Sequence, residues 1–137
     1  MPTTKWKKSL PSVSGETKNF WDAALRGKYL LQKCRNCKKF QTHYRAFCCH
    51  CWSHDVQDVE ASGKGVVWTY TVAYMNRTPG WEDEVPYVVA QIELKEGVMV
   101  LSNIINCKPE SVKIGMPVKV TFVKATPEIA MPYFEPV

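Results

Sequence analysis

The sequence contains no apolar run that approaches the roughly 18 residues of a membrane-spanning helix. Its first 13 residues are basic but lack the apolar stretch of a secretory signal. We therefore expect a cytoplasmic protein with no membrane segment. Charged residues make up 23% of the 137 residues and apolar residues 45%, with five Phe, five Trp and six Tyr. That balance excludes a disordered or collagen-like chain and suits one domain, or two small ones that share a core.

Acidic residues are scarce in the first part of the chain. Residues 1–60 hold eleven Lys or Arg and five Asp or Glu, a balance of +6, whereas residues 61–137 hold seven and eight, a balance of −1. A basic first half can attract nucleic acid, the phosphates of a nucleotide cofactor or an acidic partner protein. It can equally be an ordinary solvated surface.

Cysteine and histidine are nearly absent outside one short segment. Five of the six cysteines lie in residues 34–51 and all three histidines in residues 43–54, which leaves Cys107 alone. In a cytoplasmic protein, clustered cysteines indicate a metal site or redox chemistry rather than a disulfide framework. We interpret Cys107 as a buried or idle thiol, because the histidines that could activate it all belong to the cysteine segment.

The spacing within this segment predicts a metal centre. Two Cys-x-x-Cys pairs are separated by ten residues, a pattern in which two tight turns present four thiolates to one tetrahedral ion. Thiolates favour zinc, or less often iron, and four protein sulfurs leave no open position for catalysis. We therefore predict a structural Zn²⁺ that stabilises a small ribbon. The predicted ligands are Cys34, Cys37, Cys48 and Cys51.

Other ligand sets stay open. Cys49 could replace Cys48, and the three histidines, His43, His50 and His54, are further candidates. A redox dithiol is also possible, although such a motif normally occurs once, at the start of a helix that follows a strand.

The turns of the predicted metal site lack glycine. Metal-binding turns often carry it directly after the second cysteine, where the backbone turns tightly. Lys38 and Trp52 stand at those positions, so both must tolerate the turn.

The rest of the chain reads as mainly β with an N-terminal helix. We expect the helix to begin near Ser14 and to end at Gly27. Apolar or alternating runs predict strands at residues 29–32, 66–75, 87–94, 98–105 and 118–124, followed by an extended tail at residues 131–137. Several closely spaced strands in about seventy residues fit a small five-stranded OB-fold barrel, with a small sandwich as the alternative.

Aromatic residues recur at alternate positions of the first long strand. Trp68, Tyr70 and Tyr74 share one predicted face. We favour core packing for this face, because aromatic side chains bury large areas. The alternative is an exposed platform on which nucleic-acid bases stack.

The residues considered together resemble a known family. Its members join a rubredoxin-like zinc ribbon to an OB-fold and associate with thiolases and acyl-CoA chemistry. The resemblance covers nearly the whole chain, but the Pro-Pro that usually precedes Arg45 and the glycine after each cysteine pair are missing. The matching stretches are Phe20-Trp21, Leu31–Cys37, Tyr44-Arg45, Cys48–Cys51, Gly63–Val72, Val85–Ala90, Ile114–Val118 and Phe134–Pro136.

The resemblance implies a fold and a division of the chain. The expected fold is mainly β with an N-terminal helix, in which a rubredoxin-like zinc ribbon precedes a small OB-fold barrel. The implied parts are an N-terminal arm and helix in residues 1–33, the zinc ribbon in residues 34–60 and the OB-fold in residues 61–137.

The resemblance also implies a function. Such proteins are non-catalytic subunits that dock on a thiolase-fold enzyme in a hetero-oligomer and help to bind or channel acyl-CoA. A coenzyme A thioester shared with the partner would meet cationic groups such as Arg45. A long aromatic loop is the other expected contact with acyl-CoA or the partner, through Tyr74, Arg77, Pro79, Gly80 and Trp81.

Two other function classes compete with the accessory subunit. A nucleic-acid-binding protein would explain an OB-fold joined to a zinc ribbon, but residues 61–137 lack the basic groove that such barrels use, so we consider nucleic acid an unlikely partner. A free-standing enzyme would need an open metal site or a paired nucleophile and base, and the pattern indicates neither.

Replacing one predicted ligand tests the metal assignment. Cys37→Ser leaves three sulfurs, so we expect a lower metal content and a lower melting temperature, because metal binding and ribbon folding are linked. Elemental analysis and thermal melting of the purified variant measure both. Wild-type values for both would show that the assignment is wrong.

Overall fold

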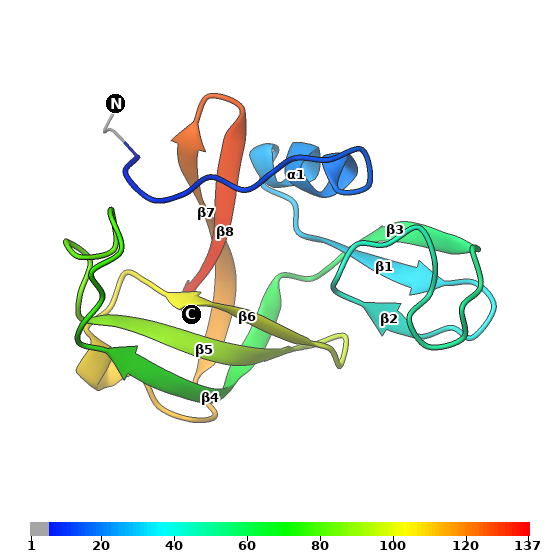
Figure 1. The fold of residues 1–137 in the computed structure, drawn as a ribbon. Helices are drawn as coiled ribbons and strands as arrows, with labels where there is room; N and C mark the ends of the chain where they lie inside the picture. The colour runs from blue at the N-terminus through cyan, green and yellow to red at the C-terminus, as the bar shows by residue number, and fades with distance from the viewer. Residues whose placement is uncertain (1–5) are drawn as a thin grey trace.

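The computed structural model describes residues 6–137 (Figure 1). The first five residues of the expected N-terminal arm lie outside this range. The chain is mainly β with one α-helix, as expected. Its elements are α1 (Lys18–Leu25), β1 (Leu30–Cys34), β2 (Phe40–Gln41), β3 (Val56–Glu60), β4 (Lys64–Ala73), β5 (Tyr87–Leu94), β6 (Met99–Ile104), a 3₁₀ turn (Pro109–Ser111), β7 (Pro117–Thr126) and β8 (Ile129–Pro136).

The helix α1 is shorter than expected at its start. Ser14 and Thr17 bond to each other through backbone and hydroxyl groups, and this turn precedes the helix. Gly27 follows the last helical turn with φ at +79°, a left-handed conformation that glycine adopts without strain. Ala23 and Ala24 are buried, and α1 packs against β8 of the barrel (Figure 1).

Three short strands form a separate antiparallel sheet in the order β2-β1-β3. The central strand β1 pairs along its whole length with β3. The strand β3 was not expected, because its five residues Val-Gln-Asp-Val-Glu do not alternate cleanly. Pairing with β1 therefore decides its structure, rather than its own pattern.

The second half of the chain forms the expected OB-like closed barrel. Its strand order is β4-β5-β6-β8-β7, and β4 pairs with β7 to close it. The tail is more regular than expected, because β8 pairs with β7 from Val118–Pro136 to Thr126–Ile129. The core includes Leu31 from the three-stranded sheet β2-β1-β3, which we call the ribbon sheet, and Phe134 from β8. The ribbon sheet and the barrel therefore share buried side chains.

A bulge in β4 changes which residues face the core. Val67 pairs with Ile92 and Thr69 with Gln91, so Trp68 has no partner on β5. The favoured core packing is therefore wrong for Trp68, which is 55% exposed. It is also wrong for Tyr74, which is 73% exposed and lies just beyond the end of β4 at Ala73. Tyr70 does pack against the core. The extra residue in a bulge shifts by one position the set of alternate side chains that face the core. Alternation of apolar residues in the sequence does not show where a bulge occurs.

No helix within residues 6–137 combines the length and apolar character that crossing a bilayer requires.

Phe134 provides the test of the shared core. It is 1% exposed and its ring lies 6.2 Å from that of Tyr29, at the junction of ribbon and barrel. We expect Phe134→Ala to lower the free energy of unfolding by about 3–5 kcal/mol. Leu101→Ala, at a 70% exposed barrel position, is the control and should change it by less than about 0.5 kcal/mol. Chemical denaturation measures both, and equal effects would contradict the shared core.

Candidate metal centre and neighbouring surfaces

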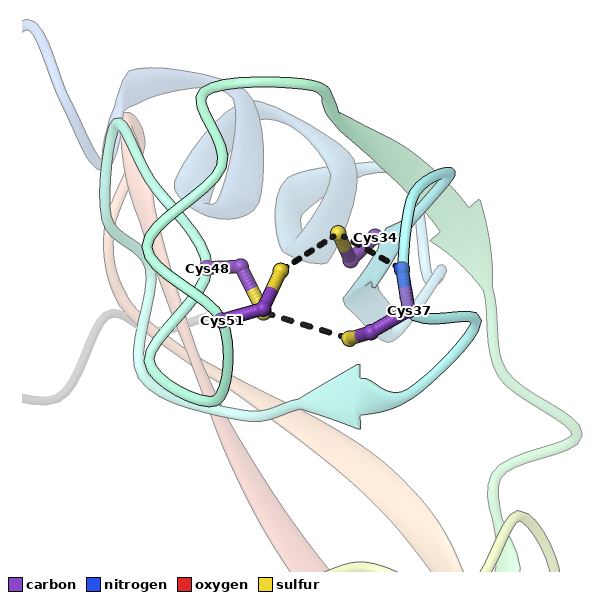
Figure 2. A group of neighbouring side chains, drawn as sticks. All are labelled: Cys34, Cys37, Cys48 and Cys51. Atoms are coloured by element: carbon purple, nitrogen blue, oxygen red, sulfur yellow. Dashed lines mark hydrogen bonds between the residues drawn. The ribbon is translucent and has the colours of Figure 1, made fainter.

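The four predicted ligands converge on one point. Their sulfur atoms all lie within 4.8 Å of one another, and the Sγ atoms of Cys34 and Cys51, and of Cys37 and Cys48, are 3.6 Å apart (Figure 2). A tetrahedral ion with metal–sulfur bonds of about 2.3 Å requires sulfur atoms about 3.8 Å apart. The arrangement therefore fits a metal such as zinc.

The two cysteine pairs adopt matching turns. The N–H of Lys38 donates to the carbonyl of Cys34, and the N–H of Trp52 donates to that of Cys48, both at 2.9 Å. Lys38 and Trp52 both have φ at 68°, in the left-handed region. The expectation that Lys38 and Trp52 must tolerate a tight turn is therefore confirmed. Each turn places its two cysteines close enough to share one ion.

Hydrogen bonds and burial shift the pKa values of Cys51 and Cys37 in opposite directions. The amide of Asn36 donates to Cys51 Sγ at 3.5 Å, and this bond, with one from the N–H of Ser53, lowers the pKa of Cys51 to about 6. The Lys39 N–H also lowers the pKa of Cys37, but burial and the neighbouring thiols outweigh it and raise that pKa to about 11. At neutral pH, metal loading must therefore release a proton from Cys37.

The alternative ligands lie outside this group. Cys49 is exposed, and its N–H donates to Gln41 Oε1 at 2.8 Å. The ring of His50 bonds to the carbonyl of Phe40 at 3.1 Å. Among residues 6–137, the convergent set contains four cysteines and no histidine. Cys107 is half-buried and packs against the core, in agreement with an idle thiol.

Arg45 lies in the loop between β2 and β3. Its Nη1 donates to the carbonyl of Tyr44 at 3.0 Å and lies 3.8 Å from a carboxylate oxygen of Glu16. The side chain is 53% exposed. About half of the side chain therefore remains open to solvent beside Glu16.

The β4–β5 loop holds the other predicted contact residues. Tyr74, Arg77 and Pro79 are exposed, whereas Gly80 is buried. Added to Gly80, a Cβ would lie 2.5 Å from the backbone carbon of Lys7, so the glycine permits close approach of the N-terminal arm. Trp81 packs on Tyr87, with ring centroids 4.8 Å apart.

Lys8 joins this loop to the barrel. Its ammonium lies 4.7 Å from the ring of Trp81 and 5.4 Å from that of Tyr133, and it bonds to Glu84 at 3.3 Å. The side chain is only 11% exposed. A cleft of about 400 Å³ lies between the arm, the loop and β7–β8. No local pattern reveals Lys8, because its partners lie about 75 and 125 residues away.

The predicted contact residues do not form one site. The loop between β2 and β3, which carries Arg45, and the β4–β5 loop lie on opposite sides of the molecule in Figure 1. A single small ligand held by this chain alone cannot use both.

Comparisons with known proteins identify the family of this chain. Residues 58–123 match the profile of "ChsH2, C-terminal OB-fold domain". A "DUF35 domain-containing scaffold protein" of Methanothermobacter thermautotrophicus is 36% identical over 97 residues, which are 70% of this chain and 72% of the relative. The chain belongs to the DUF35 family.

Two further relatives of this DUF35 chain carry names from acyl-CoA metabolism or aldol chemistry. A "probable enoyl-CoA hydratase alpha subunit" of Thermomonospora curvata is 36% identical over 126 residues, 92% of this chain. The DUF35 chain spans only 39% of that relative's length. A solved structure described as "Ltp2-ChsH2(DUF35) aldolase" is 35% identical with a TM-score of 0.81, covering 93% of this chain and 98% of the solved one.

The left-handed turn at Lys38 generates one prediction. Lys38→Gly removes the steric cost of this conformation, so we expect about 0.5–1 kcal/mol higher stability after the entropy cost of glycine. Trp52→Gly should gain less, because Trp52 stacks on Phe47 at 5.3 Å. Lys39→Gly, next in the chain, is the control and should not stabilise. Thermal melting of the metal-loaded variants compares their stabilities. An equal or greater gain in melting temperature for Lys39→Gly would show that the left-handed conformation at Lys38 is not the source of the gain.

Lys8 generates a second prediction. We expect Lys8→Ala to release the β4–β5 loop and to accelerate amide hydrogen exchange there, because a desolvated ammonium over aromatic rings contributes about 2 kcal/mol. Lys7→Ala removes an exposed ion pair with Asp83 and should have little effect. Equal exchange in the two variants would show that Lys8 does not hold the loop.

Proposed function

We propose that this chain is a non-catalytic accessory subunit of an acyl-CoA-processing hetero-oligomer, with a thiolase-fold enzyme as its partner. The observation that carries the proposal is the likeness over nearly the whole chain to the DUF35 chain of the Ltp2–ChsH2 aldolase. A metal centre built from four protein sulfurs supports it, since the centre serves the fold and leaves the chemistry to the partner.

Zinc is the metal that we propose for the four-cysteine site. Thiolate softness and tetrahedral spacing favour it over hard cations, and it stabilises the ribbon by linking both turns. The cytoplasm is the compartment that we propose, because clustered thiols stay reduced there. For the parts of the chain we propose residues 1–33, 34–60 and 61–137, although β1 begins at Leu30 and pairs within the ribbon sheet.

For contact with the partner and its acyl-CoA, we propose two separate surfaces. Arg45 offers a half-exposed cation for a coenzyme A phosphate. The exposed part of the β4–β5 loop offers an aromatic and cationic surface formed by Tyr74, Arg77 and Pro79. This surface lies next to Gly80, which contacts the N-terminal arm, and Trp81, which packs on Tyr87. Because the two surfaces lie far apart, the partner rather than this chain alone completes the binding site. One specific candidate for the whole complex is a benzoylsuccinyl-CoA thiolase.

The exposed Trp68 and Tyr74 favour a second candidate, binding of single-stranded nucleic acid by base stacking. The balance of −1 over residues 61–137 opposes it, because such binding also needs a basic groove.

Affinity capture decides between the two candidates. We expect tagged protein from native lysate to recover a thiolase-fold acyl-CoA enzyme in near-stoichiometric amount, identified by mass spectrometry. Arg77→Ala and Tyr74→Ala should reduce that recovery, whereas Lys113→Ala, at an exposed position beyond β6, should not. Recovery of nucleic acid with its binding proteins and no such enzyme would overturn the proposal, as would acyl-CoA turnover by the purified chain alone.

A further inference from the structure

Two glutamines occupy a place where polar side chains are rare. Among residues 6–137, Gln32 and Gln41 are the buried polar side chains, at 6% and 5% exposed. They lie on the paired strands β1 and β2, at directly opposite positions. Burying an amide is unfavourable unless its donors and acceptors find partners, so each must be bonded in a specific way.

Gln41 holds the backbone on both sides of Cys48. Its Nε2 donates to the carbonyl of Phe47 at 3.1 Å, and its Oε1 accepts the N–H of Cys49 at 2.8 Å. Cys48 is 0% exposed and lies between these two bonded residues. The side chain of Gln41 therefore fixes the peptide groups that orient this ligand.

Gln32 bonds to the same loop at Arg45, three residues before Cys48. Its Nε2 donates to the carbonyl of Arg45 at 2.9 Å, and its Oε1 accepts the N–H of Arg45 at 3.0 Å. The two amides are joined, because Gln41 Nε2 also donates to Gln32 Oε1 at 2.7 Å. Four hydrogen bonds thus connect strands β1 and β2 to a loop that has no strand of its own, and a fifth joins the two glutamines.

We propose that Gln32 and Gln41 are positioning residues for the metal centre, a glutamine clamp that presents Cys48 and Cys51 to the first cysteine pair. The clamp orders the loop before the ion arrives. The backbone entropy of that loop is then not lost at the binding step, which raises metal affinity and slows release. Asn36 donates a hydrogen bond directly to a sulfur atom, whereas the two glutamine amides bond to backbone groups of the loop. The clamp therefore acts through the backbone.

Metal release from the full-length protein tests the clamp. We expect Gln41→Leu to accelerate transfer of Zn²⁺ to a chromogenic chelator by about 10- to 100-fold, the usual effect of losing a group that orients a ligand. Substituted Co²⁺ should show altered d–d and thiolate charge-transfer bands, because Cys48 is displaced. Gln57→Leu is the control, since Gln57 lies on the adjacent strand β3 and bonds to Arg35. Its release rate and spectrum should match wild type.

A double variant separates positioning from packing. Replacing both amides, as Gln32→Leu with Gln41→Leu, removes all five hydrogen bonds and so releases the loop at Arg45 as well as beside Cys48. The backbone groups of the exposed Arg45 and Cys49 can then bond to water. We expect near-wild-type melting of the barrel together with fast metal release. Wild-type release and an unchanged Co²⁺ spectrum in the folded double variant would overturn the proposal.

Hydrogen exchange provides a test that needs no variant. In the zinc-loaded wild-type protein, the clamp predicts protected N–H groups at Arg45 and Cys49, although both residues are exposed. Protection equal to that of an unbonded exposed loop amide would show that the clamp does not form in solution, and would overturn the proposal even if no glutamine variant folds.

Discussion

The convergence of four thiols on one point is the constraint on which the ribbon depends. Two left-handed turns, at Lys38 and Trp52, bring sulfur atoms from residues up to 17 positions apart to within 4.8 Å. The sheet of two, five and five residues is too small to stabilise these turns through a core of its own. Four sulfur atoms this close could bind a metal ion, and such binding would supply the missing free energy, as in other small metal-binding domains.

The barrel and the ribbon are connected through shared buried side chains. Leu31 from β1 belongs to the same buried cluster as Phe134 and the barrel strands, and α1 packs against β8. The N-terminal arm adds a second connection, because Lys8 lies between Trp81 of the β4–β5 loop and Tyr133 of β8. The arm, the ribbon and the barrel are therefore held together by buried side chains and by Lys8.

Much of this arrangement could be predicted from the residues in sequence. Cysteine spacing identified the four cysteines that converge, and alternation with turn residues identified the barrel strands, because both signals are local. The sequence pattern failed where distant contacts decide the structure. The bulge turned Trp68 out of the core, Tyr74 lies beyond the end of β4, and β3 forms only because β1 pairs with it. Lys8, Gln32 and Gln41 gave no local signal, since their partners lie in other segments.

We infer that the four cysteines hold one metal ion and that no histidine takes part. X-ray absorption at the metal edge of the purified full-length protein tests it most directly. The account predicts a shell of four sulfur atoms at about 2.3 Å with tetrahedral edge features. A shell that contains nitrogen, or protein that folds fully with less than one bound metal ion per chain, would contradict it.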